Sequence, residues 1–233
     1  MYFLAAILSI INIIAQQTAQ ESTGALNWLT EKYTEGGFFM HFILACLVIG
    51  LALCIERLWT LGRASINSKE FAKKVTTALH DGGVEAAKEV CVNTRGPVAS
   101  IFYAGLLRAD EGVDSAEKAI VTYGGIEMGF LEKGLIWISL FITLAPMLGF
   151  TGTVQGMIQA FDAIKEAAQI SPSIVAGGIA VALLTTLFGL VVAMILQVFY
   201  NYFVSKIDRL VSEMEESSVE LIDALYELQV QKK

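Results

Sequence analysis

Residues 173–205 read SIVAGGIAVALLTTLFGLVVAMILQVFYNYFVS, and these 33 positions contain no Asp, Glu, Lys, Arg or His. As a helix the run would be roughly 50 Å long, well beyond the ~30 Å hydrocarbon core of one bilayer. The polar residues Gln197 and Asn201 fall near its end. We therefore expect a transmembrane helix that protrudes from the membrane at its C-terminal end.

Two further runs are long enough to cross a bilayer, for which about 20 apolar residues suffice. Residues 134–161 form 28 positions, and residues 36–55 form 20, without an Asp, Glu, Lys or Arg. Over the whole chain 55% of residues are hydrophobic and 17% are charged, against about 25% charged in soluble domains. This pattern predicts an all-α integral membrane protein with three transmembrane helices and long helical cytoplasmic extensions.

These runs divide the chain into seven predicted segments. They are an N-terminal interfacial or signal-like and exterior segment (1–35), transmembrane helix 1 (36–56), a helical loop domain (57–133), transmembrane helix 2 (134–161), a short exterior link (162–172), transmembrane helix 3 (173–205) and a C-terminal helix (206–233). Because the link is short, helices 2 and 3 are expected to be antiparallel neighbours.

The apolar residues 1–15 are too few for a comfortable span. A signal peptide carries a positive charge before its apolar core, and none precedes this block. A retained helix at the outer membrane surface is therefore favoured, with cleavage after Ala15 as the alternative.

Lysine and arginine are distributed unequally between the two sides of the predicted spans, which indicates orientation because cytoplasmic loops carry the excess. The loop after span one carries Arg57, Arg63, Lys69, Lys73 and Lys74, Lys133 precedes span two, and Lys206 and Arg209 follow span three. The opposite side has Lys32 and Lys165. The bias predicts a cytoplasmic loop and C-terminus and an exterior N-terminus.

Composition and motifs exclude several classes of function. The net charge of −7 argues against nucleic acid as a partner, because phosphate binding needs a basic surface. The three cysteines and two histidines have no metal-ligand spacing, and the chain lacks HExxH, GxSxG and Walker-loop motifs. We expect no enzyme, no metal site and no cofactor.

Small residues recur every four positions in the second and third spans, which lets neighbouring helix backbones approach closely. The stripes are Ala145, Gly149 and Thr153, then Gly152, Gly156 and Ala160, then Gly178, Ala182 and Thr186, followed by Gly189 and Ala193. We assign Gly149, Gly152, Gly156, Gly178, Ala182 and Gly189 to helix packing, around a pore or for packing alone.

Four threonines, Thr151, Thr153, Thr185 and Thr186, lie in these otherwise apolar helices and are candidates to line a proton pathway. A threonine can also satisfy its hydroxyl on a carbonyl one turn back, so simple helix packing stays open. Intramembrane proton carriers are normally Asp, Glu or His, and neither span contains one. If the protein conducts protons, another chain has to bring the titrating group.

Two motifs, LGFTGTVQGMIQAF (148–161) and AGGIAVALLTTLFGLVVAM (176–194), resemble those of the ExbB/TolQ/MotA proton-channel family. The family patterns are LG-x-x-GTV-x-GM/I-x-x-F and GI-x-x-AL-x-x-T-x-x-GL. The resemblance covers roughly residues 36–210. The short exterior link is more similar to the ExbB/TolQ branch than to the four-span MotA branch.

This resemblance implies a homopentameric ring around two copies of a single-span partner, ExbD or TolR, whose transmembrane aspartate takes up and releases protons. It places the pore threonines at Thr153 and Thr186. It also implies a bacterial inner-membrane motor with a periplasmic N-terminus, which in the ExbB case uses the proton motive force to energise TonB-dependent outer-membrane transport.

The sequence departs from the family at Val181, where well-known members carry a glutamate. A channel-lining carboxylate on this subunit is thus in doubt, and proton conduction would depend more strongly on a partner's aspartate. A TolQ-like or other specialised motor subunit remains an alternative that the neighbouring gene would distinguish. The other alternative is a non-conducting membrane scaffold, in which the threonines only hold helices together.

Overall fold

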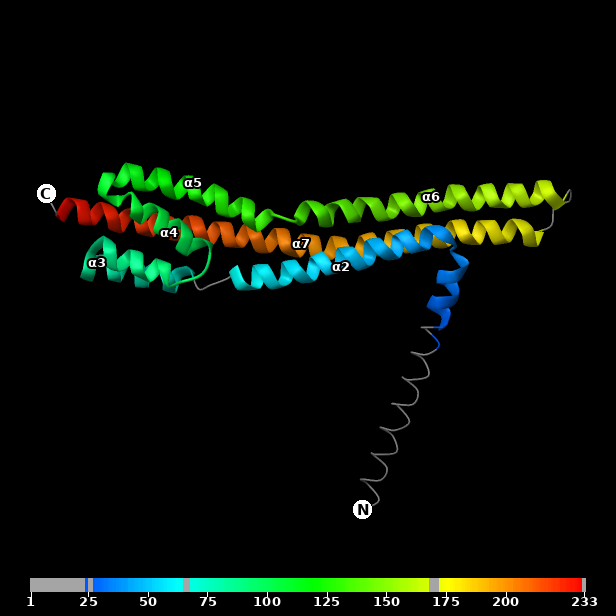
Figure 1. Cartoon of the computed structure of the whole chain (residues 1–233), viewed down its shortest axis with the longest axis horizontal. Helices are drawn as coiled ribbons and strands as arrows, with labels where there is room; N and C mark the ends of the chain where they lie inside the picture. Colours follow the sequence, from blue (N-terminus) through cyan, green and yellow to red (C-terminus); the bar gives the residue numbers. More distant parts are fainter. Residues whose placement is uncertain (1–23, 25–26, 65–67, 168–171, 232–233) are drawn as a thin grey trace, which may run out of the picture. The chain divides into compact units, whose positions relative to one another are not determined.

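The computed structural model describes residues 24, 27–64, 68–167 and 172–231, and all regular structure in this part of the chain is helical (Figure 1). The helices are α2 (Phe38–Ala64), α3 (Ser68–Val92), α4 (Pro97–Leu107), the 3-10 helix η1 (Ala109–Glu111), α5 (Val113–Glu132), α6 (Leu135–Ala167) and α7 (Pro172–Gln231). Three helical stretches are long and apolar enough to cross a membrane. The predicted all-α protein with three membrane-spanning helices is confirmed.

The chain forms two compact units, to both of which α2, α6 and α7 contribute. Unit 1 comprises residues 1–48 and 141–195, and unit 2 comprises residues 49–140 and 196–233. The predicted interfacial helix and the alternative cleavage site fall on residues 1–23, outside the described part of the chain.

In unit 1, α6 is longer than predicted. The exterior link was expected to begin at Asp162, but the helix continues to Ala167. The extension is mostly Ala, Ile, Lys and Glu, of which all but Ile are among the stronger helix formers. The first charged residue after an apolar run therefore marks a change in polarity and not the end of the helix. The rest of the link, residues 168–171, lies outside the described part.

Helix α7 runs without a break across the predicted boundary between residues 205 and 206. It begins at Pro172, where a proline costs no helical hydrogen bond, and no Gly or Pro follows Gly189 within it. Its part in unit 2 buries an apolar stripe at helical spacing. The stripe consists of Leu196, Phe203, Ile207, Leu210, Met214, Leu221 and Leu225.

The core of unit 2 is built by α3, α4 and α5 together with this stripe of α7. The rings of Phe71 in α3 and Phe102 in α4 lie 5.5 Å apart, centroid to centroid. Polar contacts at the edge of this core place α3 beside α7: Ser68 Oγ donates to Glu213 Oε2 at 3.3 Å, and Lys69 Nζ lies 3.1 Å from Glu216 Oε1.

Cys91 lies in the last turn of α3 within this core, and burial raises the pKa of its thiol from 9.0 to about 12. At pH 8 roughly one molecule in ten thousand then carries the reactive thiolate. We expect Cys91 in the native protein to resist iodoacetamide at pH 8 and to react promptly in denaturant, as followed by peptide mass spectrometry. Equal rates in both states would contradict the burial.

The same shift makes the stability of the protein depend on pH. Because the pKa of the Cys91 thiol is higher in the folded than in the unfolded state, the thiol contributes stability below pH 9 that is lost as pH rises towards 12.

The joint between α5 and α6 is formed around an arginine from α2. Gly134 has a φ of 91°, a backbone conformation that residues with a side chain rarely adopt. The Arg57 side chain is 8% exposed and packs on this glycine, so that a Cβ there would lie 2.7 Å from Arg57 Nη2. Arg57 Nη2 also lies 3.6 Å from Glu56 Oε1, and the guanidinium is buried at the joint.

Replacement of Gly134 by alanine is expected to destabilise this joint by about 1–3 kcal/mol, because the new methyl group meets both a strained φ and the buried guanidinium. Gly129→Ala is the matched control five residues earlier, where a Cβ meets no atom within 4 Å. Thermal unfolding of the two variants in the same detergent measures the difference. If Gly134→Ala melts together with Gly129→Ala, the joint does not depend on this conformation.

Candidate functional site

The antiparallel helices α6 and α7 meet in unit 1 with their backbones in direct contact. A Cβ added to Gly156 would lie 2.8 Å from Gly178 O and 2.9 Å from Ala182 N. One added to Gly178 would lie 2.7 Å from Gly156 O. No residue larger than glycine fits at these two positions without moving the helices. We call this contact between α6 and α7 the seam.

The seam continues along α6 at the same close spacing. A Cβ on Gly149 would lie 2.8 Å from Thr185 O, and one on Gly152 would lie 2.5 Å from Thr185 Oγ1. A Cβ on Gly189 would lie 2.7 Å from Ala145 O. All six small residues assigned to packing from the sequence lie in the seam.

Thr185 is fully buried in the seam against Gly152. Its Oγ1 shares one proton between two carbonyl oxygens of its own helix, those of Ala182 at 2.9 Å and Val181 at 3.1 Å. Of the four candidate threonines, Thr185 is therefore the one most deeply buried between the two helices, and its hydroxyl is satisfied within α7.

Thr153 and Thr186 lie at the edge of the seam and are half-buried. Thr186 Oγ1 lies 3.4 Å from Gly149 O on α6 and 3.4 Å from Ala182 O on α7, so its hydroxyl is held only loosely. Thr153 Oγ1 donates to Phe150 O at 2.6 Å. Because Thr153 follows Gly149 by one helical turn, both threonines lie on the same flank of the seam.

Helix α2 packs on the other flank. Gly37, the residue before α2, lies against Val181. A Cβ built on Gly37 would be 3.9 Å from Val181 Cγ1. Val181 is separated from Thr186 by five residues, or about 140° around α7 at 100° per residue. Thr153 and Thr186 thus line the flank that α2 leaves uncovered. Thr151 lies apart from both, exposed on the face of α6 away from α7, and donates to Met147 O at 2.8 Å.

A cavity of about 410 Å³ lies on the α2 side of the seam. Its walls come from the start of α2, from α6 and from α7. The lining residues are Gly36, Gly37, Phe38, Phe39, Gly152, Gln155, Gln159, Val181 and Thr185. Gln155 and Gln159 were not among the candidate site residues from the sequence, although two amides four positions apart in an apolar run are a signal that could have found them.

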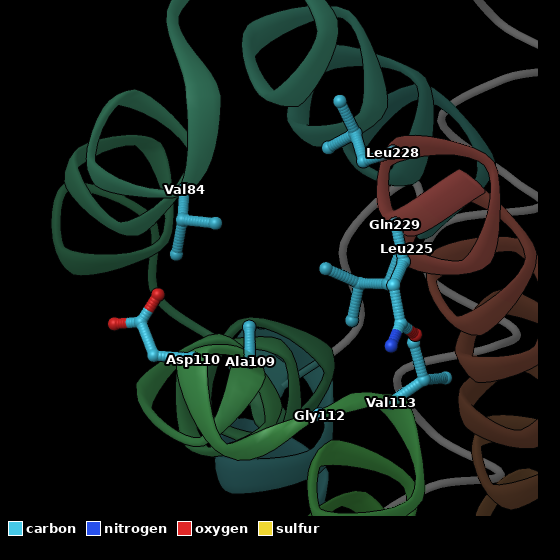
Figure 2. Close-up of a pocket in the computed structure, with 8 residues that line it drawn as sticks. All are labelled: Val84, Ala109, Asp110, Gly112, Val113, Leu225, Leu228 and Gln229. Carbon is cyan, nitrogen blue, oxygen red and sulfur yellow. The ribbon is translucent and has the colours of Figure 1, made fainter. Parts of the chain in front are cut away.

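Two further features, a pair of amides and a pocket, lie in unit 2 and involve none of the predicted site residues. Gln197 Nε2 donates to Asn201 Oδ1 at 2.9 Å, on an exposed face of α7. A pocket of about 230 Å³ has Val84 on one side and Leu225 and Leu228 on the other, with Asp110 at its edge (Figure 2).

Comparison with known proteins assigns the chain to a family. Residues 93–216, more than half of the chain, match the MotA/TolQ/ExbB proton channel family. The chain belongs to this family. The matched region includes both helical motifs and the whole seam.

Individual relatives in this proton channel family carry ExbB names. The chain is 31% identical to an ExbB homologue of Methanothermobacter thermautotrophicus over 187 residues, which is 79% of this chain and 66% of that protein. It is 26% identical to ExbB-like protein 3 of Synechocystis over 170 residues, 72% of this chain and 81% of that protein. ExbB of Pseudomonas putida is 36% identical over 78 residues, 34% of this chain and 24% of that protein.

The chain therefore spans about two thirds of the length of the Methanothermobacter relative. Membership of the proton channel family, together with three helical stretches apolar enough to span a bilayer, makes the chain a multi-pass membrane protein.

Proposed function

We propose that this chain is the channel-wall subunit of a proton-driven motor in a bacterial inner membrane, and that an ExbD-like single-span partner supplies the titrating carboxylate. The observation that supports this most directly is the set of side chains that the two apolar runs contain. Residues 134–161 and 173–205, which supply the apolar lengths of α6 and α7, contain hydroxyls and amides but no Asp, Glu or His. A proton-channel protein with such walls needs a second polypeptide that carries the proton.

The proposed pathway is the flank of the seam that α2 leaves uncovered. A partner aspartate facing the loosely held hydroxyl of Thr186 would be partly hydrated and could ionise. Against the apolar wall on either side, desolvation would raise its pKa and keep it neutral. Each proton that crosses carries about 2.3 kcal/mol per 100 mV of membrane potential, so alternation between these surroundings could drive stepwise movement.

The proposed assembly is a homo-oligomer, a pentamer by family resemblance, around two copies of the partner. Its N-terminus would be periplasmic and its C-terminus cytoplasmic, as the distribution of Lys and Arg indicates. The work would pass to a TonB-like transducer that powers outer-membrane transport.

The test is reconstitution of the chain with and without the single-span protein encoded beside it. Liposomes that contain the chain alone are expected to pass protons no faster than empty liposomes, as read by a pH-sensitive dye under an imposed potential. The co-purified complex should conduct, and an Asp→Asn change in the partner should abolish the flux. Selective conduction by the chain alone at the rate of the complex would overturn the proposal.

A further inference from the structure

We propose that the 410 Å³ cavity of unit 1 is a water-filled vestibule inside a single chain, wetted from the membrane face at which α2 begins. Its position is set by three helices of the same chain: the start of α2, the Gln155–Gln159 stretch of α6 and the Val181–Thr185 stretch of α7. It lies on the opposite flank of the seam from Thr153 and Thr186.

Two unpaired amides are the first reason to place water there. Gln155 and Gln159 are one helical turn apart and both line the cavity. Neither side-chain amide makes a hydrogen bond to any residue that the structure describes. Both glutamines are exposed in this chain, but they lie in the charge-free apolar run of α6. Within a bilayer an amide without a partner is strongly unfavourable, so both require a polar ligand there.

The start of α2 supplies further unpaired donors. Residues 27–35 are helical, Gly36 and Gly37 interrupt the helix, with Gly37 at a φ of 69°, and α2 begins at Phe38. The first N–H groups of a helix have no partner within it, and those of Phe38 and Phe39 belong to residues that line the cavity. The cavity therefore offers donors from α2 and both donors and acceptors from the glutamines.

Water matches this lining better than the other candidate occupants. None of the lining side chains is ionisable, so no charge is present to hold an ion. A lipid chain would leave both amides unsatisfied. The volume admits several water molecules, since each takes about 30 Å³ in the liquid, and buried Thr185 and Gly152 form the floor. This water would be present whether or not the assembled protein conducts protons.

Cysteine accessibility in the full chain tests the vestibule. Gln155→Cys and Gln159→Cys would be treated in open membrane fragments with a small cationic methanethiosulfonate, which reacts with the thiolate in water. Ile158→Cys is the matched control, because Ile158 is exposed at the same depth of α6 but does not line the cavity. We expect both glutamine positions to react at least tenfold faster than Ile158→Cys. The native Cys46 and Cys54 are buried, and the wild-type chain gives their background.

A second substitution identifies where the water comes from. Val181→Phe fills the cavity from α7 and is expected to slow modification of Gln155→Cys at least tenfold. If this variant assembles poorly, Val181→Leu makes the same test with one added carbon and a smaller slowing. Modification of Gln155→Cys no faster than that of Ile158→Cys would overturn the proposal, because the cavity would be dry. Rates unchanged by either filling variant would also overturn it, because the water would reach Gln155 from another side.

Discussion

Replacement of Thr186 by valine is expected to lower proton flux through the reconstituted complex at least tenfold while the complex still assembles. Valine keeps the shape of threonine but removes the hydroxyl at the edge of the seam. The structural cost is expected to be small, because Thr186 Oγ1 is 3.4 Å from each of its two carbonyl partners. Flux into liposomes, normalised to the amount of co-purified partner, measures the effect.

Thr151→Val is the matched control for this experiment. Thr151 lies in the same apolar environment, but it is exposed on the face of α6 away from α7, and its hydroxyl serves only its own helix. We expect this variant to keep wild-type flux. Full flux in Thr186→Val, with intact assembly, would remove Thr186 from the pathway and favour the view that the threonines only pack helices.

A second large effect is expected at the closest point of the seam. In Gly178→Ala the new methyl group would lie 2.7 Å from Gly156 O and 2.5 Å from Ala160 Cβ, so α6 and α7 have to move apart. Overpacking of this kind costs about 1–3 kcal/mol, and Gly178→Val should cost more. The expected result is a lower melting temperature and loss of monodisperse protein on gel filtration.

The preceding residue provides the control. Gly177 occupies the same helix, but a Cβ there meets no atom within 4 Å. Gly177→Ala should be neutral or slightly stabilising, because alanine favours a helix by up to about 1 kcal/mol over glycine. If the two alanine variants behaved alike, the backbone contact between α6 and α7 would not limit stability.

Much of the seam was predictable from the sequence, because small residues every four positions can only serve close approach of two helices that a short link holds together. The family resemblance pointed to Thr153 and Thr186, but the burial of Thr185 was not predictable from the spacing of residues. Thr185 and Thr186 are adjacent in sequence, but a 100° step around α7 puts one in the seam and the other at its edge. That distinction depends on where α6 lies, which a repeat in one helix does not reveal.

The sequence by itself determined that this is a helical membrane protein of the MotA/TolQ/ExbB kind whose second and third spans have no titrating group, because length, apolarity and residue inventory are local properties. Only the tertiary structure decided what lies on each flank of the seam. It placed Gln155 and Gln159 beside the start of α2, and Arg57 on Gly134, 77 positions further along the chain. Such contacts join distant parts of the chain, so they arise from helix packing and leave no trace in the spacing of any one segment.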